Sequence, residues 1–124
     1  MESVNIRATA KTPSIDFNPD QGLLEIRGRS TPEDSRVFYK PLIAWCEEYA
    51  VNPPAKTTVD VSLEHFDTSS SKGLLDLIKR LKTIKEMHKE VEVVWHYESS
   101  DEDILEAGEN FEHITGIPFR MTPH

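Results

Sequence analysis

The sequence predicts an α/β fold with a mixed, mostly parallel sheet of about five strands, an N-terminal hairpin and helices mainly on one face. Several short segments alternate apolar with polar residues, which is the pattern of half-buried strands. Between them, apolar residues recur every three or four positions, as on the buried face of a helix. Strands that alternate with helices along a chain favour right-handed crossovers and a parallel sheet. Because the strands alternate rather than being apolar throughout, one sheet face is expected to stay uncovered.

The N-terminal region predicts an edge strand followed by a hairpin. Residues 4–9 form a short alternating segment, which is consistent with an edge strand. Residues 14–17 and 23–27 alternate in the same way and flank the link 18–22, which contains a proline and ends in a glycine. Such a link is typical of a turn between antiparallel strands.

The next segment predicts a helix that begins near Thr31. Thr31 is a candidate N-cap, and Pro32 suits the first helical position. Pro41 removes an N–H inside this segment and is expected either to kink the helix or to start a second one. We expect a short first segment and a main helix over about 41–49, which residues 52–54 end. The apolar residues at helical spacing are Phe38, Leu42, Trp45, Cys46 and Tyr49.

The middle of the chain predicts the central strand and the central helix. Residues 58–63 alternate polar with apolar side chains, and they are followed after a polar turn by a helical stripe over about 71–89. The stripe consists of Leu74, Leu77, Ile78, Leu81 and Ile84.

The C-terminal region repeats this arrangement. Residues 91–97 predict a second parallel strand, and the capping residues and acids of 99–103 open a further helix, for which Gly116 suits the end. Residues 117–121 form a short final strand, expected at an edge because the proline within it cannot donate a hydrogen bond.

The polar turn between the central strand and helix is the main candidate site. Thr68, Ser69, Ser70 and Ser71 place four hydroxyls at a helix start, where N–H groups lack partners and the dipole favours negative charge. Two interpretations are open here: an N-cap with solvated neighbours, or a phosphorylation site. A nucleophile is disfavoured because His65, three residues back along a strand, lies roughly 10 Å from Thr68 by the usual rise.

Composition argues against several other functions. The net charge of −8 disfavours nucleic acid as a partner, and 124 residues suit one domain spanning 1–124. The single cysteine, Cys46, and the scattered histidines offer no metal-binding pattern, and residues 101–103 point in different directions on a helix. No apolar run reaches the roughly 20 residues of a membrane span, and no signal-peptide core opens the chain, so a cytoplasmic protein is expected.

Cations cluster on the central helix of this acidic chain. They form either its solvated face or a surface that steers an acidic partner. They are Lys72, Lys79, Arg80, Lys82, Lys85 and Lys89.

Five stretches of the sequence resemble the SiaC family of bacterial regulatory phosphoproteins. They are residues 11–15, 18–30, 66–72, 101–109 and 117–119, and the resemblance runs from about residue 8 to residue 120. It implies a STAS-like fold, similar to anti-sigma factor antagonists. It also implies a partner-switching role without catalytic residues, cofactor or metal.

The resemblance further implies the partners and the acceptor. Family members are phosphorylated by a dedicated protein kinase and dephosphorylated by a PP2C-type phosphatase. The unphosphorylated form binds and activates a diguanylate cyclase, which links it to cyclic di-GMP and to biofilm or aggregation control. The family's acceptor follows Phe-Asp, which here is Thr68. The residues implied at the partner surface are Asp67, Thr68, Ser69, Ser70, Ser71 and Lys72.

One departure from a related pattern and three rival functions bear on this expectation. The chain differs from the Asp-Ser-Ser-Gly version of the anti-sigma antagonists by additional residues before Gly73. A STAS-like sensor would bind a small ligand in a concave apolar pocket beside the turn, and an anti-sigma-type antagonist would bind a different protein. An enzyme that uses Thr68 would need a base within reach.

Overall fold

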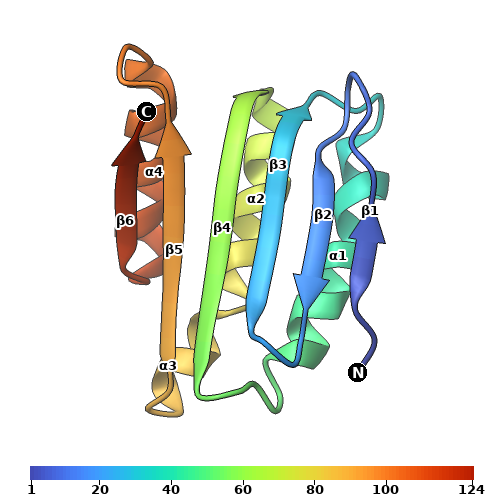
Figure 1. Cartoon of the computed structure of the whole chain (residues 1–124), viewed down its shortest axis with the longest axis vertical. Coiled ribbons are helices and arrows are strands. Elements are labelled where there is room, and N and C mark those ends of the chain that lie inside the picture. The colour runs from blue at the N-terminus through green and yellow to red at the C-terminus, as the bar shows by residue number, and fades with distance from the viewer.

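The computed structural model describes residues 1–124 and contains a six-stranded sheet with α1, α2 and α4 behind the same face (Figure 1). The strands lie side by side in chain order from β1 to β6. They are β1 (Val4–Ile6), β2 (Ser14–Asn18), β3 (Leu23–Ser30), β4 (Lys56–Phe66), β5 (Glu90–Tyr97) and β6 (Phe119–Pro123). The helices are α1 (Ser35–Tyr49), α2 (Thr68–Lys79), α3 (Lys82–Glu86) and α4 (Glu102–Thr115).

The strand pairing confirms the predicted mixed sheet. β1, β2 and β3 pair antiparallel, whereas β3, β4, β5 and β6 pair in parallel. The predicted hairpin is the β2–β3 pair, closed by the link 18–22. The sheet has six strands rather than about five. The edge strand expected at residues 4–9 is β1, which spans 4–6 and pairs with the outer side of β2.

Helix α1 differs from its prediction in two ways. Its N-cap is Asp34 rather than Thr31, and the Asp34 carboxylate accepts a hydrogen bond from the N–H of Val37 at 3.2 Å. The predicted two-segment helix is wrong, since α1 runs unbroken through Pro41. The proline removes one helical bond to the carbonyl of Val37, on a face exposed to water, while buried residues on both sides hold the helix to the core.

Helix α2 begins at Thr68, three residues before the expected start near residue 71. It also ends earlier, and the remainder of the predicted 71–89 helix becomes α3. The N–H groups of Arg80 and Leu81 bond to the carbonyls of Leu77 and Ile78, three residues back. This tightening ends α2 and turns the chain before α3.

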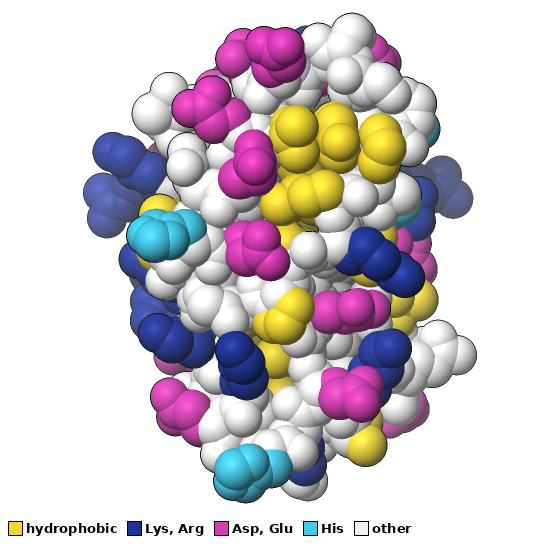
Figure 2. All heavy atoms as spheres, turned by 90° about the vertical axis from the view of Figure 1, so that its left-hand side faces the viewer, with side chains coloured by type: hydrophobic (Ala, Val, Ile, Leu, Met, Phe, Trp, Pro, Cys, Tyr) yellow, Lys and Arg dark blue, Asp and Glu magenta, His cyan; other side chains and the backbone are white.

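The C-terminal elements follow the prediction closely. Asp101 caps α4 by accepting a bond from the N–H of Ile104 at 3.0 Å, and acids fill the first turn. Gly116 ends α4 in the left-handed conformation at φ 71°. β6 lies at the sheet edge, where Figure 2 shows hydrophobic side chains gathered among acidic ones. None of the four helices combines the length and apolarity needed to cross a bilayer.

The core lies between the sheet and its helices. Along β4, Thr57, Val59, Val61 and Leu63 are buried, whereas the residues between them are only half-buried. A cluster of 24 buried hydrophobic residues extends from Ile15 to Phe119 and joins every strand from β2 to β6. The other sheet face has no helix over it, as the alternation predicted.

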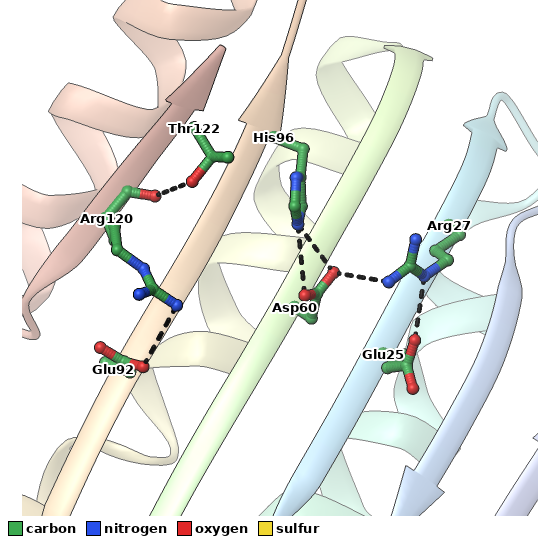
Figure 3. Close-up of polar contacts among 7 residues, drawn as sticks. All are labelled: Glu25, Arg27, Asp60, Glu92, His96, Arg120 and Thr122. Carbon is green, nitrogen blue, oxygen red and sulfur yellow. Dashed lines mark hydrogen bonds and ion pairs between the residues drawn. The ribbon is translucent and has the colours of Figure 1, made fainter. Parts of the chain in front are cut away.

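Charged side chains cross this uncovered face (Figure 3). Asp60 on β4 accepts from Arg27 on β3 at 3.2 Å and lies 3.2 Å from the ring Nε2 of His96 on β5. Arg120 on β6 lies 3.8 Å from Glu92 on β5. The charges on this face are therefore largely paired with one another across neighbouring strands.

Candidate functional site

The polar turn is held rigidly between β4 and α2. The Asp67 carboxylate accepts a hydrogen bond from the N–H of Ser70 at 2.8 Å and so caps α2. The N–H of Asp67 donates to the carbonyl of Ser30, the last residue of β3, at 3.1 Å. The turn is thus tied both to its own helix and to a neighbouring strand.

The four hydroxyls of the turn are not equivalent. Ser70 is 0% exposed and Ser71 is half-buried, whereas Thr68 and Ser69 are exposed. Only Thr68 and Ser69 therefore present a hydroxyl freely to another protein. Of the predicted partner-binding set 67–72, the structure brings all but Ser70 to the surface.

Beneath the turn, three buried hydroxyls form a connected group. Ser30 Oγ lies 2.8 Å from Ser70 Oγ and 2.7 Å from the hydroxyl of Tyr39. The three residues come from β3, α2 and α1, and none is more than 1% exposed. A buried hydroxyl without a partner costs about 1–3 kcal/mol, so this group fixes the relative positions of the three elements.

Tyr39 stays protonated in this group. Burial raises the pKa of Tyr39, and the negative charge of Asp67 raises it further, against the lowering effect of the hydrogen bonds with Ser30 and Ser70. The tyrosine is therefore a neutral hydroxyl at neutral pH.

Gly73 allows Tyr39 to lie against α2. A Cβ at Gly73 would lie 2.7 Å from two atoms of the Tyr39 ring, closer than real Cβ atoms approach. Glycine inside a helix costs about 1 kcal/mol relative to alanine, and the packing explains its presence here. The sequence pattern did not point to Ser30 or Tyr39. The one signal for this contact is a glycine inside an otherwise strongly amphipathic helix.

The hydrogen bonds of the turn's side chains join hydroxyls, the Asp67 carboxylate and backbone groups, and none reaches a histidine or a lysine. His65 is exposed at the end of β4. No group of three histidine, cysteine or acidic side chains is placed to hold a metal ion.

What the geometry does offer is an accessible hydroxyl on a fixed turn at the start of a helix. Residues 6–124 match the SiaC family of regulatory phosphoproteins. The chain belongs to this family. The resemblance that the sequence motifs indicated is therefore confirmed.

Three known proteins or structures are similar to this chain over nearly its whole length. An uncharacterised protein of Pseudomonas aeruginosa strain UCBPP-PA14 is 28% identical over 124 residues, which cover 100% of this chain and 98% of that protein. The solved structure of SiaC of Pseudomonas aeruginosa is 27% identical, covers 100% of both chains and has a TM-score of 0.89. A further structure shows the diguanylate cyclase SiaD in complex with its activator SiaC, also from Pseudomonas aeruginosa. The matched chain of that structure is 28% identical to this chain with a TM-score of 0.88, and the match covers 98% of this chain and 99% of the matched one.

Proposed function

We propose that this SiaC-family protein is a non-enzymatic partner-switching protein, reversibly phosphorylated on Thr68, whose unphosphorylated form binds and activates a diguanylate cyclase. It thereby controls cyclic di-GMP and, through it, biofilm formation or aggregation. The observation that carries the proposal is Thr68 itself, exposed as the first residue of α2 on a turn fixed by Asp67. The solved complex of a related SiaC with the cyclase SiaD supports the choice of partner.

Thr68 is the preferred acceptor among the four hydroxyls. A kinase must reach the hydroxyl and align it with a phosphate donor, which disfavours the buried Ser70 and the half-buried Ser71. Ser69 is exposed but lines a groove between α1 and α2. The Phe66-Asp67-Thr68 motif further supports Thr68.

Phosphorylation acts through local charge in this proposal. A phosphate adds about −1.5 to −2 charge directly beside the Asp67 carboxylate. At a partner interface, this charge imposes repulsion and a desolvation cost. The helix start accepts an anion without unfolding, because its free N–H groups and dipole favour negative charge. Leu74, Leu77 and Ile78 anchor α2 in the core at 0% exposure each.

The proposal includes the protein's surroundings. A kinase and a PP2C-type phosphatase set the phosphorylated fraction, and the exchange takes place in the cytoplasm, where ATP and GTP are available to kinase and cyclase. The buried cluster from Ile15 to Phe119 supports treating 1–124 as one domain.

The test uses the purified chain with the kinase and the cyclase of the same organism. Kinase and ATP are expected to add one phosphate, which intact-mass and peptide mass spectrometry place on Thr68. Thr68→Ala removes labelling, whereas the matched control Ser69→Ala keeps it. The unphosphorylated chain is expected to raise the rate of cyclic di-GMP synthesis, and the phosphorylated chain is not. Equal labelling of Thr68→Ala and the parent, or no stimulation by the parent, contradicts the proposal.

The alternative is a small-ligand sensor or an anti-sigma-type antagonist with another partner. The groove beside the turn is the observation that keeps the sensor in consideration. Seven of its eleven lining residues are polar or charged, whereas the surface that it exposes is mostly apolar. Such a mixed lining suits an amphipathic protein segment as well as a small ligand.

A further inference from the structure

The two edges of the sheet differ in how far they are protected from pairing with another chain. At the β6 edge, Pro118 precedes the strand and Pro123 ends it, and proline has no N–H to offer a neighbouring strand. Between them, the N–H of Phe119 is already bonded to the Glu112 carboxylate at 2.8 Å. Prolines and charged side chains of this kind keep an edge from pairing. The β1 edge has neither, since Val4–Ile6 contains no proline and no charged residue.

The register of the sheet shows which backbone groups of β1 are free. The N–H of Thr58 on β4 donates to the carbonyl of Gly22 at 2.8 Å, so Gly22 points towards β4. Backbone groups alternate in direction along a strand, so Glu25, three residues on, points towards its β2 partner Asp16. Asp16 in turn points towards β3, and its two neighbours along β2 point towards β1.

Asn5 is the residue of β1 whose backbone points away from the sheet. Val4 pairs with Phe17 on β2, and its N–H and C=O groups are used in that pair. Ile6 pairs with Ile15 in the same way. Asn5 between them therefore keeps its N–H and C=O groups free on the outer side. Because directly paired residues project from the same face, Val4 and Ile6 lie on the helix-covered face, where their partners are buried.

An apolar strip accompanies the free backbone on the helix-covered side. Ile6 is 41% exposed there, although its partner on β2 is buried. Trp45 of α1, the helix behind β1 and β2 in Figure 1, faces the same edge, because its Nε1 donates to the carbonyl of Glu2 at 2.8 Å. Pro41 and Val37 lie one and two turns before Trp45 along α1, and Val37 is 69% exposed. The β1 edge thus combines free backbone groups with apolar side chains that no element covers.

This edge complements a second copy of itself. In an antiparallel pair about a two-fold axis through Asn5, each Asn5 backbone donates to and accepts from its own copy. Val4 then lies opposite Ile6 of the second copy, so apolar side chains meet on the helix-covered side. Arg7 lies opposite the uncharged Ser3 of the second copy, and the two Arg7 residues are about 13 Å apart along the strands. No like charges therefore oppose one another in this register.

We propose that the protein forms a two-fold symmetric dimer in which β1 pairs antiparallel with β1 of a second copy, centred on Asn5. The two six-stranded sheets then form one continuous sheet. A ladder of about five residues per chain places the interface at or below the roughly 1,200 Å² of weak complexes, so the dissociation constant is expected in the micromolar range or above. Helix α1 lies between this edge and α2, so Thr68 stays exposed in both copies, and the inference goes beyond the proposed function.

Sedimentation velocity over micromolar to millimolar concentrations tests the dimer. The buffer has raised ionic strength, which screens the repulsion between copies of net charge −8. The parent is expected to change from monomer to dimer mass across the series. Asn5→Pro removes the free N–H at the centre of the new ladder but leaves the pairs of β1 with β2, so it is expected to raise the dissociation constant at least about tenfold. A parent that stays monomeric throughout overturns the proposal.

A matched pair of charge substitutions keeps the dimer testable if Asn5→Pro does not fold. Ile6→Lys places a charge in the apolar strip and is expected to weaken dimerisation about tenfold or more. The control Ile114→Lys makes the same change on α4, where Ile114 is 48% exposed, and is expected to stay within about twofold of the parent. Far-UV circular dichroism checks that each variant is folded. Equal dimerisation by the parent and Ile6→Lys, or equal weakening by both variants, overturns the β1 interface.

Cysteine cross-linking tests the register. Asn5→Cys brings two thiols together in a hydrogen-bonded pair, whose Cα atoms lie about 5.5 Å apart and within reach of a disulfide. Under mild oxidation it is expected to form a covalent dimer, whereas Arg7→Cys, about 13 Å from its copy, is not. The native Cys46 is 0% exposed and does not react. Equal cross-linking of both variants overturns the register, and none of these measurements involves kinase or cyclase, so the proposed function stands or fails separately.

Discussion

Helices α2 and α4 start in the same way but differ in charge. Each follows a parallel strand, and each is capped by an aspartate whose carboxylate accepts from an N–H three residues on: Asp67 at 2.8 Å and Asp101 at 3.0 Å. The first turn of α4 contains Glu102 and Asp103, whereas the first turn of α2 contains no acid. Both starts carry the charge of the capping aspartate, but α4 adds two acids in its first turn where α2 has only hydroxyls.

The two helices also share a close contact with an aromatic ring. Gly73 of α2 faces Tyr39, and Gly108 of α4 faces Trp95, where an added Cβ would lie 2.7 Å and 2.6 Å from the nearest ring atoms. Trp95 Nε1 donates to the carbonyl of Ile104 at 2.9 Å, whereas the Tyr39 hydroxyl bonds to Ser30. The same arrangement of a helix on the sheet therefore carries fixed acids in the first turn of α4 and hydroxyls, which a phosphate can modify, in the first turn of α2.

The first prediction tests whether a capped hydroxyl is sufficient for phosphorylation. Glu102→Thr places a threonine after a capping aspartate in α4, at the position that Thr68 has in α2. We expect the kinase to label Thr68 at least about tenfold faster than the threonine introduced at position 102, a discrimination of roughly 1.4 kcal/mol. The reason is that the start of α4 lacks the other residues that surround Thr68 in its turn. Site-resolved mass spectrometry of the variant measures both rates. Equal labelling at both positions would show that the local motif alone directs the kinase.

The second prediction concerns Gly73 and Gly108, the two helical glycines that lie against aromatic rings. Gly108→Ala is expected to lower the free energy of unfolding by about 1–3 kcal/mol, since Trp95 is 1% exposed and hydrogen-bonded and cannot shift. Gly73→Ala should cost a similar amount or somewhat less and should also disturb the Thr68 turn. Urea unfolding measures the stability, with Glu109→Ala on the exposed side of α4 as the control. A stabilised Gly108→Ala would mean that helix propensity outweighs the contact.

The third prediction uses the titration of the buried hydroxyl beneath α2. Burial raises the pKa of Tyr39 above the 10.0 of an exposed tyrosine, so the unfolded chain loses this proton first as pH rises. The corresponding stability is complete below pH 10.0 and is lost as the pH rises through the folded value. Burial raises the pKa of Cys46 and Tyr49 in the same direction, so Tyr39 contributes one part of the alkaline decrease.

Tyr39→Phe tests this contribution. At pH 7 the variant should be about 0.5–1.5 kcal/mol less stable, because it lacks the hydrogen bond with Ser30. Its stability should then fall less steeply than that of the parent above pH 10.0. Denaturant unfolding across the alkaline range measures both slopes, and an unchanged slope would exclude Tyr39 as a contributor.

The smallest expected effect exchanges the charges of the two helix starts. Thr68→Asp should stabilise α2, and Glu102→Gln should destabilise α4, each by about 0.3–1 kcal/mol at low salt. Thr68→Asp should also weaken cyclase binding, but less than phosphorylation does, because it adds about one charge instead of nearly two. Thermal melts, far-UV circular dichroism and binding titrations measure these effects. Loss of the folded signal on phosphorylation would instead indicate an order–disorder switch.

Much of the fold could be predicted because its signals are local. The hairpin link 18–22, the alternation in 58–63 and 91–97, and the glycine that ends α4 each depend on neighbouring residues along the chain. The acids of 101–103 were also interpreted correctly, as a cap and a charged first turn. Boundaries were less predictable. Asp34 and Thr31 are both good capping residues, and the start of α1 depends on where its buried side chains meet the sheet.

By itself, the sequence determined the order of strands and helices, the uncovered sheet face and the presence of a hydroxyl-rich turn after the central strand. Only the tertiary structure decided which hydroxyls remain accessible. Ser69 and Ser70 are neighbours of the same type, yet one is exposed and the other is 0% exposed and bonded to Ser30, 40 positions away in the chain. The groove likewise exists only because α1 and α2 pack together on one sheet face. Local patterns fix the conformation of a segment, whereas burial depends on contacts between segments that no local pattern encodes.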